Sequence, residues 1–186
     1  MKLERFSNVF TSRWLNVFES SFSHNGKEGK WYFASRSENP YDNPKCNAVV
    51  IIPKYIHPDG TESYVMIKEF RVPLMDYEWG FPAGLIEEDH TAEYTAEKEL
   101  KEETGLEVTK ILEVGPPTYS SSGMTDESLQ VVFVECTGNP TDIHNESSEL
   151  IETHIFSLEQ IKELMKKEVK FSARAWCFLK GLTCTR

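Results

Sequence analysis

The sequence predicts an α/β fold in which a mixed set of strands is combined with a few helices. The observations behind this prediction are the apolar run NAVVII, an alternating stretch after it, and a glutamate-rich stretch with helical character. The chain has 186 residues, which suits one domain with a sizeable core and an appended element. We therefore expect one main core, with a functional site at the glutamate-rich helix.

The N-terminal region is rich in aromatic residues and predicts an antiparallel hairpin. Ser12–Phe22 and Lys30–Arg36 are its expected strands, because the intervening HNGKEG contains two glycines on which the chain can turn. Ser37–Pro44 contains two prolines and several turn formers, which indicates a linker. The predicted division is an N-terminal hairpin region at residues 1–44 and a main domain at residues 45–186.

A second sheet is expected to begin after this linker. Cys46–Ile56 contains the apolar run and predicts a buried strand, and Ser63–Arg71 alternates as a strand with one buried face does. A P-D-G-T turn separates the two stretches. Val72–Gly80 is expected to be a loop that leads into Phe81-Pro82-Ala83.

The C-terminal half continues this mixture of strands and helices. The segment PPTYSSSGMTDES is too polar and too rich in turn formers for either element. Ser157 and Ser172 are expected to cap two helices. The expected strands are Glu107–Val114, Leu129–Cys136 and Leu150–Phe156, and the expected helices are Leu158 to about Lys167 and Ala173 to about Leu182.

The glutamate-rich stretch predicts a helix with clear ends. Thr91 is a suitable N-cap, the residues from Ala92 to Thr104 are mostly good helix formers, and Gly105 stands where a glycine commonly ends a helix. The helix is therefore expected to span Ala92 to Thr104.

Three carboxylates of this helix are expected to lie on one face. Glu99, Glu102 and Glu103 are spaced i, i+3 and i+4, which brings them together at 3.6 residues per turn. No basic residue is expected between them on that face, and hard cations such as Mg²⁺ bind clusters of oxygen ligands. The alternative is an ordinary solvated face of a glutamate-rich helix.

Composition excludes several classes of function. The net charge of −10 argues against a nucleic-acid partner, because phosphate backbones are bound by lysine and arginine. No stretch is long enough for a membrane span, and Met1–Phe10 lacks a signal-peptide pattern. The four cysteines form no C-x-x-C pair or zinc spacing, so we expect reduced thiols in a cytoplasmic protein, with Cys46 and Cys136 in the core.

The stretch from Gly84 to Leu106 resembles the Nudix hydrolase signature, G-x5-E-x7-R-E-U-x-E-E-x-G-U, where U is aliphatic. His90 replaces the first glutamate and Lys98 replaces the arginine, positions that mainly brace the loop and helix in the family. A metal-ligand role for His90 is the alternative to a structural one. Lys98 keeps the charge but lacks the planar fork of arginine. The matching residues are Gly84, Glu99, Leu100, Glu102, Glu103, Gly105 and Leu106.

This resemblance implies an α/β/α sandwich with a mixed sheet and a hydrolase that depends on Mg²⁺, with Mn²⁺ as an alternative ion. It implies that Glu99 and Glu103 bind the metal directly, together with the backbone carbonyl of Ala83, and that Glu102 binds directly or through water. Glu102 and Glu103 would then also be catalytic residues.

Several further segments resemble the ADP-ribose pyrophosphatase branch of that family. Gly80 departs from this branch, because many members carry glutamate just before the FPAG element. The similar segments are FPAGLI at Phe81–Ile86, Glu69-Phe70-Arg71, Ser122–Glu127, Ser148–Glu152, and Phe171–Ala175.

The narrower resemblance implies a catalytic base and residues that bind the diphosphate. Glu149 matches the late acidic residue of this branch and would take the proton from the attacking water, with Glu146 as the substitute. Arg71 and Arg36 would bind the diphosphate, since a guanidinium pairs well with phosphate oxygens. The alternatives are an exposed loop carboxylate and surface arginines.

The N-terminal hairpin resembles the region that forms a homodimer in this branch and stacks adenine between aromatic rings. Trp14 and Trp31 would supply those rings, and Met124 would line the ribose side of the substrate. The alternatives are core packing for the tryptophans and a filling role for the methionine.

The function implied by the resemblance is hydrolysis of the diphosphate bond of a nucleoside diphosphate sugar. ADP-ribose, cleaved to AMP and ribose 5-phosphate, is the expected substrate. Another nucleotide sugar such as GDP-mannose is the enzymatic alternative. A Nudix-like sensor that binds a nucleotide sugar without cleaving it is the alternative from a different class.

Overall fold

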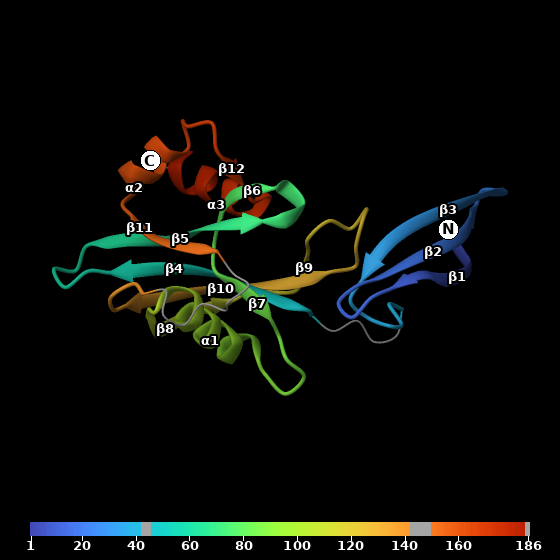
Figure 1. The fold of residues 1–186 in the computed structure, drawn as a ribbon, viewed down its shortest axis with the longest axis horizontal. Coiled ribbons are helices and arrows are strands. Elements are labelled where there is room, and N and C mark those ends of the chain that lie inside the picture. Colours follow the sequence, from blue (N-terminus) through green and yellow to red (C-terminus); the bar gives the residue numbers. More distant parts are fainter. Residues whose placement is uncertain (42–45, 142–149, 185–186) are drawn as a thin grey trace. The chain divides into compact units, whose positions relative to one another are not determined.

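The structure is a computed structural model that describes residues 1–41, 46–141 and 150–184. The chain forms two compact units (Figure 1). The first contains Met1–Asn47 and Pro117–Leu129, and the second contains Ala48–Pro116 and Gln130–Arg186. The domain boundary predicted between residues 44 and 45 stays a prediction.

The first unit is built on a three-stranded antiparallel sheet with the order β1-β2-β3. β2 (Asn16–His24) and β3 (Lys27–Ser35) form the predicted hairpin. β1 (Lys2–Thr11) was not predicted, because almost all of its residues are exposed and its pairing is interrupted by register shifts, so no regular apolar alternation marks it. Phe18 of β2 is buried and contacts the rings of Phe6 and Phe33.

The second unit contains a mixed sheet, which confirms the predicted α/β fold. The central order is β12-β6-β5-β4-β10-β8, with β11 paired to β5 and β7 paired to β4. β12 and β6 pair in parallel, whereas β5 pairs antiparallel with β4, β6 and β11, β4 with β7, and β8 with β10. The bounds are β4 (Ala48–Ile56), β5 (Glu62–Arg71), β6 (Asp76–Gly80), β7 (Ala83–Leu85), β8 (Glu107–Val114), β10 (Ser128–Thr137), β11 (Ile151–Phe156) and β12 (Lys170–Phe171).

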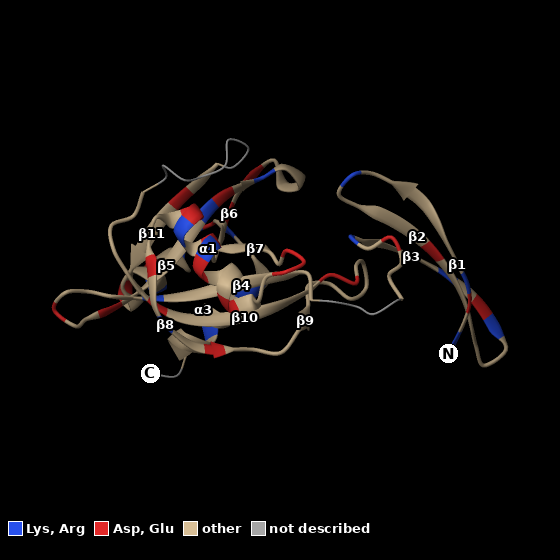
Figure 2. Ribbon diagram, turned by 90° about the horizontal axis from the view of Figure 1, so that it is seen from below, with Lys and Arg blue, Asp and Glu red and all other residues tan. Residues whose placement is uncertain are grey.

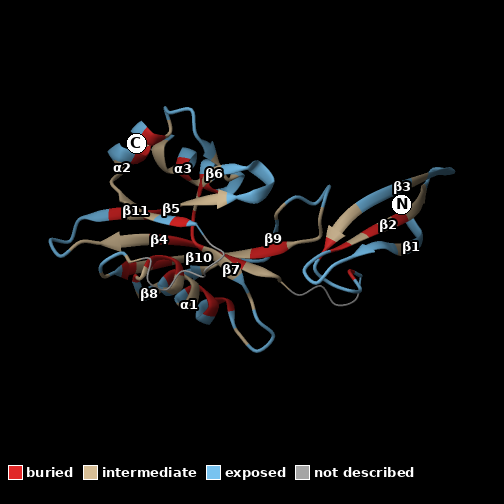
Figure 3. Ribbon diagram, viewed as in Figure 1, coloured by how far each residue is buried: buried red, intermediate tan, exposed pale blue. Residues whose placement is uncertain are grey.

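Helices cover both faces of this sheet. Figure 1 shows α1 (Ala92–Thr104) on one side, and α2 (Leu158–Leu164) and α3 (Ala173–Cys184) on the other. The core under α1 joins Ala96 and Leu100 to apolar side chains of β4, β5 and β10 (Figure 3). The arrangement is therefore the α/β/α sandwich that the resemblance implied.

The predicted ends of α1 are confirmed. The Thr91 hydroxyl accepts a hydrogen bond from the Tyr94 N–H at 3.2 Å. Gly105 has a φ of 72° and its N–H donates to the Lys101 carbonyl, as expected for a glycine that ends a helix. α2 has the predicted Ser157 cap but ends at Leu164, before the predicted Lys167.

The prediction that Val72–Gly80 forms a loop was wrong. A short 3-10 helix, η1 (Val72–Leu74), is followed by β6, and Met75 between them has a φ of 47°. β6 pairs with β5 from Ile67 opposite Gly80 to Arg71 opposite Asp76. The sequence did not reveal this strand because a stretch as short as DYEWG, with charged residues and a glycine, carries almost no periodic signal. β7, β12 and β9 (Thr118–Tyr119) were missed for the same reason.

All four cysteines lie in the described residues and are free. Cys136 is buried in the core as predicted, and burial raises the pKa of its thiol to about 12. Cys46 is only half-buried. Among the helices of the described chain, none combines the length and apolar character needed to cross a membrane.

Candidate active site

Glu103 is the buried carboxylate of the predicted cluster. It follows Leu100 on the inner side of α1, and its side chain and backbone are 5% exposed. One carboxylate oxygen accepts a hydrogen bond from the Ala83 N–H at 3.3 Å, and the Thr153 hydroxyl donates to the Glu103 carbonyl at 3.3 Å. Glu103 is thus fixed against the backbone residue whose carbonyl the resemblance names as a metal ligand.

Glu99 packs directly over Gly84. A Cβ built on Gly84 would lie 2.1 Å from Cδ of Glu99, closer than real atoms approach. Gly84 lies in β7, opposite Val49 of β4 in the sheet. The glycine is therefore required by the close approach of the Glu99 side chain.

Lys98 contradicts the expectation that no basic residue stands among the carboxylates. Its ammonium lies 3.2 Å from Glu102 Oε2, and 3.6 Å from both Glu99 Oε1 and Glu87 Oε1. Burial acts to lower the pKa of Lys98, but the hydrogen bond to Glu102 and the nearby carboxylate charges outweigh it and the pKa is raised. Figure 2 shows acidic and basic residues next to one another on α1. The face is partly neutralised because the flexible Lys98 side chain reaches it from the neighbouring helix position.

The donor set fits a hard divalent cation in its chemistry. Glu99, Glu102 and Glu103 supply carboxylate oxygens, and Ala83 supplies a backbone carbonyl. In this conformation, no three histidine, cysteine or acidic side chains within the described ranges are placed to surround one ion. Lys98 serves as the counter-charge, so an ion that binds these carboxylates must compete with its ion pairs.

Arg71 is held between two carboxylates near Ala83. Its Nη1 lies 2.6 Å from Glu69 Oε1, and its Nε lies 3.8 Å from Glu78 Oε2. These three side chains line a cavity of about 30 Å³ together with Ala83 and Arg174. The alternation of β5 places Glu69 and Arg71 on one face of the strand. The cavity therefore joins the predicted diphosphate-binding arginine to the backbone at Ala83.

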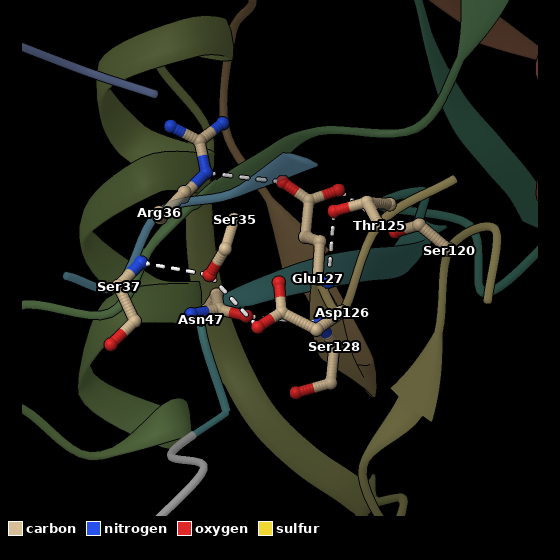
Figure 4. Close-up of polar contacts among 9 residues, drawn as sticks. All are labelled: Ser35, Arg36, Ser37, Asn47, Ser120, Thr125, Asp126, Glu127 and Ser128. Carbon is tan, nitrogen blue, oxygen red and sulfur yellow. Dashed lines mark hydrogen bonds and ion pairs between the residues drawn. The ribbon is translucent and has the colours of Figure 1, made fainter. Parts of the chain in front are cut away.

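Arg36 belongs to a polar network within the first unit (Figure 4). Its Nε donates to Glu127 Oε1 at 3.2 Å, and the Ser120 hydroxyl donates to the other oxygen of Glu127 at 2.9 Å. The Ser35 hydroxyl donates to Asp126 Oδ2 at 2.8 Å. This network fixes the segment after β3 to the loop that carries Asp126 and Glu127.

Trp31 lines an aromatic pocket of about 400 Å³ within the first unit. Its Nε1 donates to the Gly123 carbonyl at 2.9 Å, and the Ala34 N–H donates to the Met124 carbonyl at 2.8 Å. The 117–129 loop is thereby fastened to β3. The lining residues are Met1, Leu3, Ser20, Phe22, Trp31, Phe33, Tyr41, Tyr119, Ser122, Thr125 and Asp126.

Trp14 and Met124 are placed differently from Trp31. Trp14 is 64% exposed, does not line the Trp31 pocket, and has the Arg13 guanidinium 4.5 Å from its ring centroid. The Met124 side chain is also exposed. Trp31 is exposed as well, so neither tryptophan packs in the core, which was the alternative role for both.

The remaining predicted residues divide into two groups. Glu149 and Glu146 lie outside the described residues. His90 packs against Tyr94 with ring centroids 4.4 Å apart, and its Nδ1 lies 3.8 Å from Glu87 Oε2. These contacts favour the structural reading of His90 at the entry to α1.

Several polar contacts in the two units join residues to which the sequence assigns no role. Glu69, Asp126 and Glu127 lie in segments that carry the resemblance, but no role was predicted for them, and Glu78 was not named. The two-residue spacing of Glu69 and Arg71 is the only local signal among these pairs, because Glu78 comes close to Arg71 through the pairing of β5 with β6, and the Ser35 and Arg36 contacts join positions 91 residues apart.

A family model described as the NUDIX domain matches residues 47–177. The chain belongs to the Nudix family. The match contains α1 and all the described carboxylates of the site. The first 46 residues, with Trp14, Trp31 and Arg36, lie before it.

Known relatives agree with this assignment of the Nudix chain. A Caenorhabditis elegans protein named as a nudix hydrolase is 30% identical over 138 residues, covering 74% of this chain and 61% of that protein. The Saccharomyces cerevisiae protein named ADP-ribose pyrophosphatase is 29% identical over 182 residues, covering 91% of this chain and 77% of the yeast protein. A crystal structure described as an ADP compounds hydrolase has a TM-score of 0.73 at 22% identity, covering 96% of this chain and 91% of that chain, and supports the fold.

Gly84→Ala should displace Glu99 from this Nudix site while leaving the fold intact. The added methyl group meets the end of a flexible side chain, which can move, so the melting temperature should change little. Affinity for Mn²⁺, measured by isothermal titration, should fall about 10- to 100-fold, the range seen when a ligand loses its orientation. Gly181→Ala in α3 is the matched control, because its Cβ meets nothing within 4 Å. Unchanged Mn²⁺ affinity in Gly84→Ala would show that Glu99 is not a ligand.

Proposed function

We propose that this Nudix chain hydrolyses the diphosphate bond of a nucleoside diphosphate sugar, with ADP-ribose cleaved to AMP and ribose 5-phosphate. The observation that carries the proposal is the buried Glu103 carboxylate held by the backbone of Ala83 beside Glu99. Membership of the Nudix family supports the reaction class. The name of the yeast relative, which aligns with 91% of this chain, supports the choice of ADP-ribose.

The proposed cofactor is Mg²⁺, with Mn²⁺ as an alternative. Glu99, Glu103 and the Ala83 carbonyl would hold it, and Glu102 would bind directly or through water. When bound, the ion supplies charge neutralisation, polarisation of phosphorus–oxygen bonds and activation of water. Without it, Lys98 neutralises Glu99 and Glu102, which keeps the carboxylates from repelling one another.

The proposed proton acceptor is Glu149, with Glu146 as the substitute. Its role is to take a proton from the attacking water. Arg71 is proposed to bind the diphosphate, and the ion pairs to Glu69 and Glu78 support this by fixing the guanidinium in one orientation. Arg36 is proposed to bind the diphosphate as well, and its ion pair with Glu127 orients its guanidinium in the same way.

The proposed adenine site uses Trp31, with Trp14 supplied by a second subunit. The pocket lined by Trp31, Phe33 and Tyr119 supports this, because flat aromatic walls suit a planar base. Trp14 of the same chain does not line this pocket, so a Trp14 ring stacked on the adenine would have to come from the partner copy. Met124 is proposed to line the ribose side.

A panel of ADP-ribose and GDP-mannose, assayed with Mg²⁺ and with chelator, tests the proposed function. Cleavage of ADP-ribose that is abolished by chelator is expected. Faster cleavage of GDP-mannose than of ADP-ribose would contradict the proposed substrate and favour the alternative nucleotide sugar. Tight binding of either compound without cleavage would contradict an enzymatic function and favour the alternative, a sensor that binds a nucleotide sugar.

Glu103→Gln should lower kcat for ADP-ribose about a hundredfold or more, because it keeps the shape of the side chain but removes a ligand charge. The melting temperature should stay close to that of the parent protein. Glu97→Gln is the matched control, since Glu97 is an exposed glutamate on the same helix. Near-normal turnover of Glu103→Gln at limiting Mg²⁺ would contradict the metal assignment.

Trp31→Ala should raise KM for ADP-ribose roughly tenfold and leave kcat mostly intact, because stacking of a base on an aromatic ring contributes about 1–3 kcal/mol to substrate and transition state alike. Tyr32→Ala is the matched control, as an exposed aromatic residue that does not line the pocket. The loss should be smaller for GDP-mannose. An equal loss on both substrates, with a large drop in melting temperature, would instead assign Trp31 a structural role.

The first unit should mediate a two-fold homodimer. Its described surface exposes Val9, Phe10, Trp14 and Trp31, more apolar area than a small sheet leaves to solvent without a partner. Sedimentation velocity at micromolar concentration should show a dimer. A monomer at every concentration up to that range would contradict both the dimer and the shared adenine site.

A further inference from the structure

A second pocket lies away from the carboxylates of α1. It has a volume of about 910 Å³ and is lined by residues of β6, β11, α2, α3 and the segment between the helices. Figure 1 shows α2 and α3 next to each other on the face of the sheet opposite α1. Its volume falls in the range of small-molecule sites, roughly 300–1,000 Å³. The proposed hydrolysis makes no use of it.

Aromatic side chains form part of the lining of this pocket. The rings of His154 and Phe156 are stacked with centroids 5.4 Å apart and planes inclined by 10°. Trp79 packs on His154 with centroids 4.8 Å apart. Trp176 also lines the pocket from α3 and is 40% exposed, although Phe171 contacts its ring. The lining therefore includes a Trp176 side chain that remains partly accessible.

The lining of the pocket has more lysines than glutamates, in contrast to the chain as a whole. Four lysines and two glutamates line it, in a protein with a net charge of −10. Lys166 pairs with Glu163 at 2.6 Å. Among the described residues, Lys162, Lys167 and Lys180 form no ion pair with a carboxylate. Their ammonium groups remain available to an anion.

We propose that this α2–α3 pocket binds a small anion that carries a planar ring, the chemistry of a nucleoside monophosphate. The aromatic residues provide a face for the ring, and the three lysines without carboxylate partners provide charge for the phosphate. A plain solvated helix face explains the lysines but not the exposed indole and the hollow beside them. A purely apolar ligand explains the indole but leaves the lysines without a role.

AMP is the probe, measured by isothermal titration in the presence of chelator so that metal-dependent binding at α1 does not contribute. The wild-type chain should bind AMP more tightly than adenosine, which lacks the charge, or inorganic phosphate, which lacks the ring. Lys162→Gln/Lys180→Gln should weaken AMP binding at least tenfold. Lys110→Gln is the matched control, because Lys110 is an exposed lysine of β8 outside the pocket.

Two further variants distinguish this pocket from the proposed adenine site. Trp176→Ala should weaken AMP binding, whereas Trp31→Ala should leave unchanged the part of AMP binding that the double lysine variant removes. The proposal is overturned if the double lysine variant binds AMP as tightly as the parent, if Trp31→Ala abolishes binding, or if phosphate binds as tightly as AMP. Failure of these tests leaves hydrolysis of ADP-ribose unaffected, because Lys162, Lys180 and Trp176 belong to a different face of the sheet.

Discussion

The contact between α1 and the backbone of β7 is the constraint on which the candidate active site depends. Glu103 accepts a hydrogen bond from Ala83, and Glu99 occupies the space that a side chain at residue 84 would fill. Leu100 between them is fully buried in the core. The same turn of helix therefore anchors the domain and positions the carboxylates, so the helix cannot shift along its axis without moving both.

That constraint concentrates negative charge in a partly buried place, and the chain compensates for it locally. A buried carboxylate needs hydrogen bonds or a counter-charge, and Glu103 obtains a backbone N–H while Glu99 and Glu102 obtain the Lys98 ammonium. A lysine suits this role because its single ammonium group on a flexible stem can leave the carboxylates. An arginine would hold them with a planar fork. Lysine in place of arginine at residue 98 thus allows the carboxylates to be released more readily from their ion pairs.

The parts that the sequence predicted are those marked by local rules. The buried strand β4, the ends of α1 and the Ser157 cap all follow from periodicity and capping within a few residues. The helical spacing of Glu99, Glu102 and Glu103 likewise predicted a shared face, but the reach of Lys98 depends on its side-chain conformation and was missed. The sequence did not predict β6, which is too short to show a periodic pattern, or β1, whose residues are too exposed to show one. The pairing of Arg71 with Glu78 required knowledge of β6, so this part of the site could not be predicted without the fold.

The first unit shows how residues outside the family match can act with residues inside it. The match begins at residue 47, yet the 117–129 loop, which it includes, folds onto β3. Trp31 donates to Gly123, and the Ala34 N–H donates to Met124, so the aromatic pocket has walls from both parts of the chain. Changes in the N-terminal sheet can therefore alter the shape of this pocket while the α1 carboxylates, which pack in the second unit, keep their own contacts. The pocket proposed to bind the base and the carboxylates proposed to act on the diphosphate thus lie in different units, each with its own contacts.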